Sequence, residues 1–277
     1  MAIEKTEAIV LRTVNYRDTS KVVTFYTKRH GKMSAIAKGV RNPKNKFGSL
    51  LQPLNYLQIV FYRRENRDLQ YVSSSEFVRY FKTLTSDMTK FAIAMSLLEI
   101  INRVMHDEEE NEQIFGLLVD SLIALDAKET LPLNVFAYFG LHLASGLGFE
   151  PAFSRCLLCG NSIDLEKEKE VAYVIEKGSP ICEKCAANIG QSYVLSASAL
   201  RILHNFVRLT AEAASKSSIE PSLQRELSNF VFVYLRRHSD TLREIKSLKF
   251  LAAAQYTTGP AQDSIEEADG ASRHVLE

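Results

Sequence analysis

Short apolar runs separated by polar clusters fill residues 7–75 of the chain. The runs are rich in β-branched and aromatic residues, which favour strands, and the clusters contain residues that favour turns. This pattern predicts five strands, at residues 7–15, 21–27, 33–37, 54–62 and 69–74. Five short strands in so short a segment predict a small closed barrel, because closure leaves no exposed sheet edge.

After residue 76 the apolar residues recur with the spacing of helices. The spacing predicts helices at residues 91–101, 114–125, 133–147, 196–209 and 221–237, and a weaker one at 242–253. Pro132 suits the first turn of the third helix, and Gly146 and Gly148 suit its end. Residues 153–190 interrupt the helical pattern, although residues 171–175 fit a strand.

These elements predict an α+β protein with several domains. We expect residues 1–80 to form an N-terminal five-stranded OB-fold barrel, although an SH3-like barrel would show much the same pattern. Residues 81–152 and 191–255 are expected to form one all-helical domain, into which residues 153–190 are inserted as a small module. Residues 256–277 lack a periodic apolar pattern and are expected to be a disordered tail.

The formal net charge of +1 conceals an uneven distribution along the chain. Residues 1–80 hold 15 Lys+Arg and 6 Asp+Glu, a net charge of +9, whereas the rest holds 19 and 27, a net charge of −8. A basic barrel joined to an acidic remainder suggests a polyanionic partner for the barrel.

No apolar run approaches the length that crosses a bilayer, and the polar start lacks the apolar segment of a signal peptide. We therefore expect the protein to stay in the cytoplasm, associated with the nucleoid if its polyanionic partner is DNA. Disulfides are rare in that reducing compartment, so paired cysteines there indicate metal ligands or redox groups.

The four cysteines of the chain form two Cys-x-x-Cys pairs, Cys156 with Cys159 and Cys182 with Cys185. Each pair forms a turn that points two thiolates at one metal ion, and Gly160 permits the backbone angles that such a turn often needs. Together the pairs supply the four sulfur ligands of a tetrahedral Zn²⁺ site, with a zinc ribbon or similar hairpin in the 22-residue gap between them. Four sulfur ligands leave no position open for water, so we expect one structural zinc ion.

A redox dithiol and unrelated buried cysteines are the alternatives to zinc. A redox pair normally needs a single Cys-x-x-Cys on a βαβ background, which the pattern lacks. His106-Asp107-Glu108 followed by a cysteine pair partly imitates a zinc deaminase, but Arg155 stands where that signature has proline. The deaminase interpretation would also leave the second cysteine pair without a purpose.

The segment 38–48 is the most informative loop of the predicted barrel. Within nine residues it carries four cations, Lys38, Arg41, Lys44 and Lys46. Such a loop can line a groove and neutralise phosphates, although a solvated basic turn would have the same composition. Seven further cations could extend the basic surface: Lys21, Lys28, Arg29, Lys32, Arg63, Arg64 and Arg67. Some of the interleaved aromatic residues are candidates to stack on bases: Tyr16, Phe25, Tyr26, Phe47, Tyr56, Phe61 and Tyr62.

Residues 7–53 resemble the opening of the RecO family of bacterial recombination and repair mediators. The resemblance rests on the loop Ala37-Lys38-Gly39-Val40-Arg41, on the runs KNKFG and LLQP that follow it, and on the paired cysteines. The order of parts also matches, with an OB-fold, a helical domain and an inserted Cys₄ zinc module, over roughly residues 1–250. Asn45 stands where many members carry serine.

The resemblance implies a non-enzymatic protein that binds single- and double-stranded DNA and anneals complementary strands. It implies action with RecR on DNA coated by single-stranded DNA-binding protein, which helps to load RecA. It makes Lys38 and Arg41 the first candidates for DNA contact, with Lys44 and Lys46 next. It also places a pocket for the acidic C-terminal tail of single-stranded DNA-binding protein in the helical domain, where the candidates are Arg201, Arg208, Arg236 and Arg237.

The residues alone leave two other classes open. One is an RNA-binding factor with an OB-fold and a zinc ribbon, which acts in transcription or translation. The other is an enzyme with dispersed catalytic carboxylates. The chain has no Walker-type loop, G-x-S-x-G, H-E-x-x-H or G-x-G-x-x-G motif, and no cysteine outside the two pairs to serve as a nucleophile.

Overall fold

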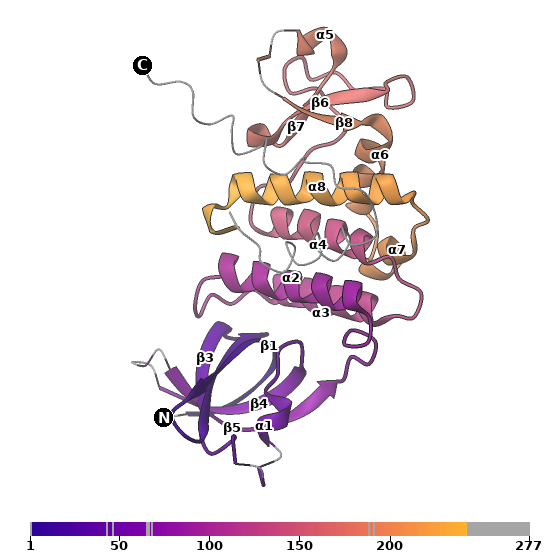
Figure 1. The fold of residues 1–277 in the computed structure, drawn as a ribbon. Helices are drawn as coiled ribbons and strands as arrows, with labels where there is room; N and C mark the ends of the chain where they lie inside the picture. Colours follow the sequence, from indigo (N-terminus) through magenta and orange to yellow (C-terminus); the bar gives the residue numbers. More distant parts are fainter. Residues whose placement is uncertain are drawn as a thin grey trace, which may run out of the picture.

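The computed structural model describes residues 2–42, 44–45, 47–64, 67, 69–187, 189–190 and 192–242. Lys46 and the tail predicted at 256–277 lie outside the described residues, as does the helix predicted at 242–253 apart from Leu242. The described chain forms a β-barrel, a layer of helices and a small three-stranded module, with the barrel and the module at opposite ends of the helical layer (Figure 1).

Five strands close into the N-terminal barrel, in the order β1-β2-β3-β5-β4. The strands are β1 (Ala2–Tyr16), β2 (Ser20–Thr27), β3 (Gly31–Ala37), β4 (Tyr56–Arg63) and β5 (Leu69–Arg79), with the short helix α1 (Phe47–Leu50) between β3 and β4. β3 and β5 pair in parallel, and β4 pairs with β1 to close the barrel. The prediction of a five-stranded OB-fold barrel is confirmed.

Two of the strands are longer than their sequence pattern predicts. β1 begins at Ala2, because residues 2–9 pair with β4, although their charged side chains hide the strand pattern. β5 continues to Arg79, while the predicted strand stops at residue 74. Its last part alternates poorly because neither face of it is buried.

Each face of the barrel has its own apolar core. Inward-facing residues such as Val23, Phe25 and Phe61 fill the barrel. Part of the outer face, including Ile9 and Tyr26, belongs instead to the large core of the helical layer. The barrel is therefore fixed to the helices by packing, since this outer face is buried only where the helices cover it.

The helical layer contains all five strongly periodic helices that the sequence predicts. They are α2 (Met88–Val104), α3 (Glu112–Asp126), α4 (Pro132–Gly146), α6 (Ala197–Phe206) and α8 (Pro221–His238). A short helix, α7 (Ala211–Lys216), was not predicted, because its six residues are too few to show a period. None of the helices in the described ranges has the length and apolarity needed to span a membrane.

Local signals begin and end these helices as expected. Asp87 and Asn111 accept hydrogen bonds from the backbone N–H groups of Lys90 and Ile114, which caps α2 and α3. Pro132 lies in the first turn of α4, and Gly148 has a φ of +88° just beyond its end.

The two helical stretches on either side of the inserted module pack together through α4 and α8. Gly140 of α4 makes their close approach possible, since a Cβ there would lie only 2.2 Å from Cγ1 of Val231 on α8. The helices before and after residues 153–190 therefore share one core.

The inserted module contains a sheet of three strands, β6 (Glu170–Val174), β7 (Ser179–Ile181) and β8 (Tyr193–Ser196), in the order β7-β6-β8. Because β8 ends at Ser196, this sheet extends beyond residue 190, where the sequence pattern places the end of the module. The 3₁₀ turn η1 (Ile175–Lys177) joins β6 to β7, and the single-turn helix α5 (Glu183–Ala186) follows β7. Tyr173 of β6 packs edge-on against Phe230 of α8, with the ring centroids 4.9 Å apart, and Phe153 lies beside both rings. The core of this module is thus continuous with the helical core.

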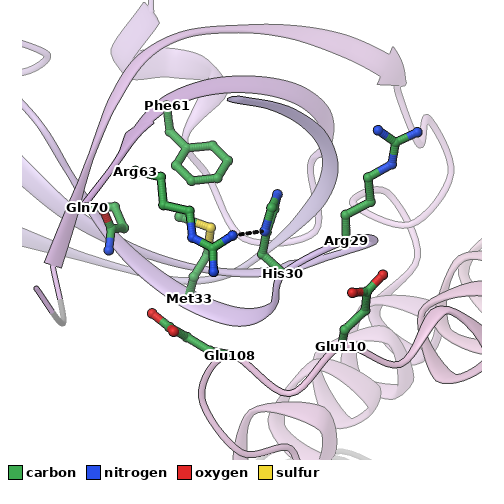
Figure 2. Close-up of a pocket in the computed structure, with 8 residues that line it drawn as sticks. All are labelled: Arg29, His30, Met33, Phe61, Arg63, Gln70, Glu108 and Glu110. Carbon is green, nitrogen blue, oxygen red and sulfur yellow. Dashed lines mark hydrogen bonds between the residues drawn. The ribbon is translucent and has the colours of Figure 1, made fainter. Parts of the chain in front are cut away.

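The loop between α2 and α3 forms hydrogen bonds with the barrel at the junction between the barrel and the helices. The backbone N–H of Glu108 donates to the carbonyl of Lys32 at 2.9 Å, and the hydroxyl of Tyr26 donates to the carbonyl of Asn111 at 3.3 Å. A cavity of about 360 Å³ remains beside this contact, where Arg29, His30 and Arg63 of the barrel face Glu108 and Glu110 of the loop (Figure 2).

Candidate nucleic-acid interface and metal centre

The loop that follows β3 packs against the turn between β1 and β2. The backbone N–H of Arg41 donates to the carbonyl of Thr19 at 2.9 Å, and its guanidinium donates to the carbonyl of Arg17 at 2.9 Å. The side chain of Asn45 makes two hydrogen bonds within the loop. It donates to the carbonyl of Gly39 at 3.2 Å and accepts from the N–H of Phe47 at 2.9 Å. Asn45 therefore helps to hold the shape of the loop.

This arrangement gathers exposed cations at one end of the barrel. Lys38, Arg41 and Lys44 are exposed, and the β1–β2 turn adds Arg17, which is also exposed. In the ranges that the structure describes, none of the four forms an ion pair with a carboxylate, so their charges are available to a ligand. Lys46, the fourth cation predicted in this loop, lies outside the described residues.

Arg17 was not among the residues selected from the sequence. It is four residues before Lys21 and more than twenty from Lys38, so sequence distance gave no reason to group it with the loop. The one available signal was its place in a turn next to an aromatic residue, and its guanidinium does lie 5.3 Å from the ring centroid of Tyr16.

Three of the cations that could have extended this surface are neutralised at the other end of the barrel. Lys28 pairs with Glu112 at 3.2 Å, Lys32 with Asp107 at 3.4 Å, and Arg63 with Glu4 at 3.6 Å. His30 lies between Arg63 and Glu4, and Figure 2 shows its contact with Arg63. Burial lowers the pKa of the His30 imidazole despite the nearby Glu4 carboxylate. An acidic loop thus covers this end, which leaves the loop 38–45 as the more accessible basic surface.

The structure also separates the aromatic residues into core and surface. Phe25, Tyr26, Tyr56 and Phe61 are buried, so these four cannot stack on bases, contrary to the possibility that the sequence left open. Tyr16 and Tyr62 keep part of their surface exposed. Tyr71, which the sequence did not single out, is 36% exposed, and Nζ of Lys38 lies 5.6 Å from its ring centroid.

The four cysteines converge at the outer end of the inserted module. The sulfur atoms of Cys156, Cys159, Cys182 and Cys185 all lie within 4.8 Å of one another, and those of Cys159 and Cys182 are 3.8 Å apart. In a tetrahedral site with Zn–S bonds of about 2.3 Å, neighbouring sulfur atoms would be about 3.8 Å apart. The donor set and its dimensions therefore fit a zinc ion.

The backbone around the cysteines has the form of two metal-binding turns. The N–H of Gly160 donates to the carbonyl of Cys156 at 2.9 Å, with Gly160 at a φ of +72°, and the N–H of Cys185 donates to the carbonyl of Cys182 at 2.9 Å. Burial raises the pKa of the Cys156 thiol, but backbone N–H groups of Cys159, Cys182 and Leu158 outweigh burial and bring that pKa to about 6. These N–H groups stabilise thiolate, which is the form that binds a metal.

Two of the four arginines considered for a protein tail in the helical domain are already paired with carboxylates. Arg201 contacts Glu166 at 2.6 Å, and Arg237 contacts Glu176 at 3.0 Å. Arg236 instead lies 5.4 Å from the ring centroid of Phe232 on its own helix.

Comparison with known protein families assigns both the barrel and the helical region. Residues 1–81 match the family described as Recombination protein O N terminal, and residues 85–249 match the one described as Recombination protein O C terminal. The chain belongs to the RecO family. The resemblance noted in residues 7–53 thus extends over nearly all of the described chain.

Several curated RecO proteins are similar to this chain along almost their whole length. DNA repair protein RecO of Chloroherpeton thalassium is 30% identical over 249 residues, which cover 88% of this chain and 96% of that protein. The protein of the same name from Salinibacter ruber is 31% identical, over 91% of this chain and 94% of its own length. That of a Thermoanaerobacter species is 27% identical, with 91% and 98% covered. This RecO-family protein is therefore similar to DNA repair proteins over 88–91% of its length.

Proposed function

We propose that this protein is a non-enzymatic mediator of DNA repair and recombination, which binds single-stranded DNA at the loop end of its barrel and anneals complementary strands. The observation that supports this most directly is the group of exposed cations described above, on a member of a DNA repair family. Lys38 and Arg41 are the first candidates for contact, and Lys44 and Lys46 are the next.

The mechanism is charge neutralisation. The guanidinium of Arg41 has five N–H donors, one of which holds the carbonyl of Arg17, so the others remain for a phosphate. Cations that neutralise phosphates release counterions and let a second backbone approach the first. Annealing by this route needs no nucleotide hydrolysis. Double-stranded DNA binds the same cations, since it presents the same phosphates.

The proposal includes the family's partners. The protein acts in the cytoplasm with RecR on DNA coated by single-stranded DNA-binding protein, whose acidic tail docks on cations of the helical domain, and so helps to load RecA. One structural Zn²⁺ ion bound by Cys156, Cys159, Cys182 and Cys185 holds the inserted module together.

The salt dependence of DNA binding tests the role of the loop. Each phosphate contact to a single strand contributes about 0.7 to the slope of log K against log salt concentration. Replacing two contacts, in the double variant Lys38→Ala/Arg41→Ala, should therefore make the slope shallower by about 1.4 and slow the annealing of complementary strands. An unchanged slope would remove the loop from the mechanism.

A charge-matched variant controls for the loss of two positive charges. Lys128→Ala/Lys216→Ala removes two exposed cations of the helical region, outside the barrel, and it should leave the slope and the annealing rate unchanged. The annealing reaction is run with strands precoated by single-stranded DNA-binding protein, with and without RecR. A parallel competition between DNA and RNA of one sequence distinguishes a DNA mediator from an RNA-binding factor.

A further inference from the structure

A row of apolar side chains crosses the outer face of the barrel next to the cationic loop. Strand pairing sets its members directly opposite one another: Ile3 faces Tyr62, Tyr62 faces Tyr71, and Tyr71 faces Ile36. Ile36 in turn faces Val22, which faces Val14. Opposite residues on paired strands point to the same face of a sheet, so these six form one continuous band, called here the outer row.

The outer row lies outside both cores. Ile3 is 67% exposed, Val14 45% and Tyr71 36%, and the other three members are partly exposed. Elsewhere the same outer face is covered, since Ile9, Tyr26 and Tyr56 belong to the core shared with the helices. Solvent-facing positions of a strand normally carry polar residues, so six consecutive apolar positions across five strands indicate a ligand that prefers apolar contact.

The surroundings of the outer row show which ligand it suits. Lys38 lies two residues after Ile36 on the same face, and its Nζ is 5.6 Å from the ring centroid of Tyr71. Arg12 lies two residues before Val14 and is exposed. An apolar band bordered by cations matches a ligand with flat apolar groups on an anionic backbone, which is the chemistry of a single-stranded nucleic acid.

Tyr62 and Tyr71 form the centre of the row. Their rings are stacked, with centroids 5.6 Å apart and an interplanar angle of 27°. The ammonium of Lys38 lies over Tyr71, so a phosphate that draws it aside also uncovers aromatic surface. The cation and the ring are thus close enough to bind the phosphate and the base of one nucleotide.

We propose that the outer row is a base-stacking platform for unpaired bases of a single strand, centred on Tyr71 and Tyr62. This rests on the proposed function, because it extends the contact from the phosphates at the loop to the bases beside it. The bases of a duplex are stacked on one another and cannot use the platform. The platform therefore gives the barrel a preference for single strands that phosphate contacts alone would not give.

The test compares an oligo-dT strand with an abasic deoxyribose-phosphate strand of the same length. Tyr71→Ala should weaken binding of oligo-dT about tenfold, since stacking on one aromatic ring has roughly this effect, and leave binding of the abasic strand unchanged. Tyr71→Phe keeps the ring and should bind like the wild type, whereas Tyr71→Leu keeps an apolar side chain without the ring and should behave like Tyr71→Ala. Tyr80→Ala removes a tyrosine that is 56% exposed outside the row and serves as the control.

The outcomes separate the platform from the proposed function. If wild-type protein binds the abasic strand as tightly as oligo-dT, or if Tyr71→Ala weakens both strands or a duplex equally, the platform is refuted. In those cases the Lys38→Ala/Arg41→Ala variant still decides whether the loop binds DNA. If wild-type protein binds none of these strands, the proposed function itself fails.

Discussion

Gly31 lies where the barrel contacts the acidic loop, and we expect a substitution there to disturb this contact. This residue has a φ of +58°, and a Cβ there would lie 2.2 Å from the carbonyl oxygen of Glu109, 2.5 Å from its carbonyl carbon and 2.7 Å from its nitrogen. All three atoms are backbone, so no side-chain rotation relieves the overlap. In the variant Gly31→Ala the loop before α3 has to move away from the barrel.

The cost of Gly31→Ala follows from what that movement breaks. A residue with a Cβ in the left-handed region costs about 1–2 kcal/mol by itself. Displacing the loop also loses the hydrogen bond from Glu108 to Lys32, worth about 1 kcal/mol, and the ion pair of Lys32 with the exposed carboxylate of Asp107, worth up to about 1 kcal/mol. We therefore expect the free energy of unfolding to fall by about 3 kcal/mol.

Urea titration followed by circular dichroism measures this loss, and Gly148→Ala is the matched control. Gly148 also has a positive φ, of +88°, but a Cβ there would meet nothing within 4 Å. The control should therefore lose only the backbone cost of about 1–2 kcal/mol. Limited proteolysis should cut the 107–110 segment faster in Gly31→Ala than in the control. Equal losses of stability in the two variants would show that the loop does not press on the barrel as described.

Two further predictions concern the cysteine cluster and a partly buried histidine. The purified protein should carry one equivalent of Zn²⁺ per chain, and Cys185→Ser or chelation should release it and lower the melting temperature; a metal-free protein that melts like the untreated one would refute the structural role. His142 has its pKa lowered from 6.5, chiefly by burial, even though its Nε2–H donates to the carbonyl of Phe206, 3.2 Å away. Because the unfolded chain then binds the proton more readily, the free energy of unfolding should fall as the pH drops below 6.5. His142→Gln should make this fall smaller, and an identical pH dependence in the variant would contradict the prediction.

Much of the fold follows from local pattern. The five strands and the five longer helices lie where apolar periodicity predicts them, because one face of each must be buried whatever its neighbours are. The errors fall in segments that have no buried face or are too short to show a period. β5 was predicted too short, since its last residues are exposed on both sides, and α7 was missed, since six residues do not complete two turns.

The sequence predicted one candidate site more completely than the other. The cysteine cluster was predicted in full, because two Cys-x-x-Cys turns restrict their own geometry and leave little for the rest of the chain to decide. The cationic loop was also identified, but Arg17 joined it only in the folded barrel, where the β1–β2 turn meets the loop. Tyr71 emerged in the same way, through its pairing with Tyr62 across β4 and β5.

The sequence by itself determined most of the elements of this protein, its family resemblance and the four cysteines that form one cluster. Only the tertiary structure decided which charged groups and aromatic rings remain exposed to a ligand. A period of two shows that Phe25 and Tyr26 point to opposite faces, yet both are buried, one inside the barrel and the other beneath the helices. Lys32 and Lys38 are equivalent by composition, but one meets Asp107 and the other faces solvent. The physical reason is that availability depends on what covers a surface, and the covering residues come from distant parts of the chain.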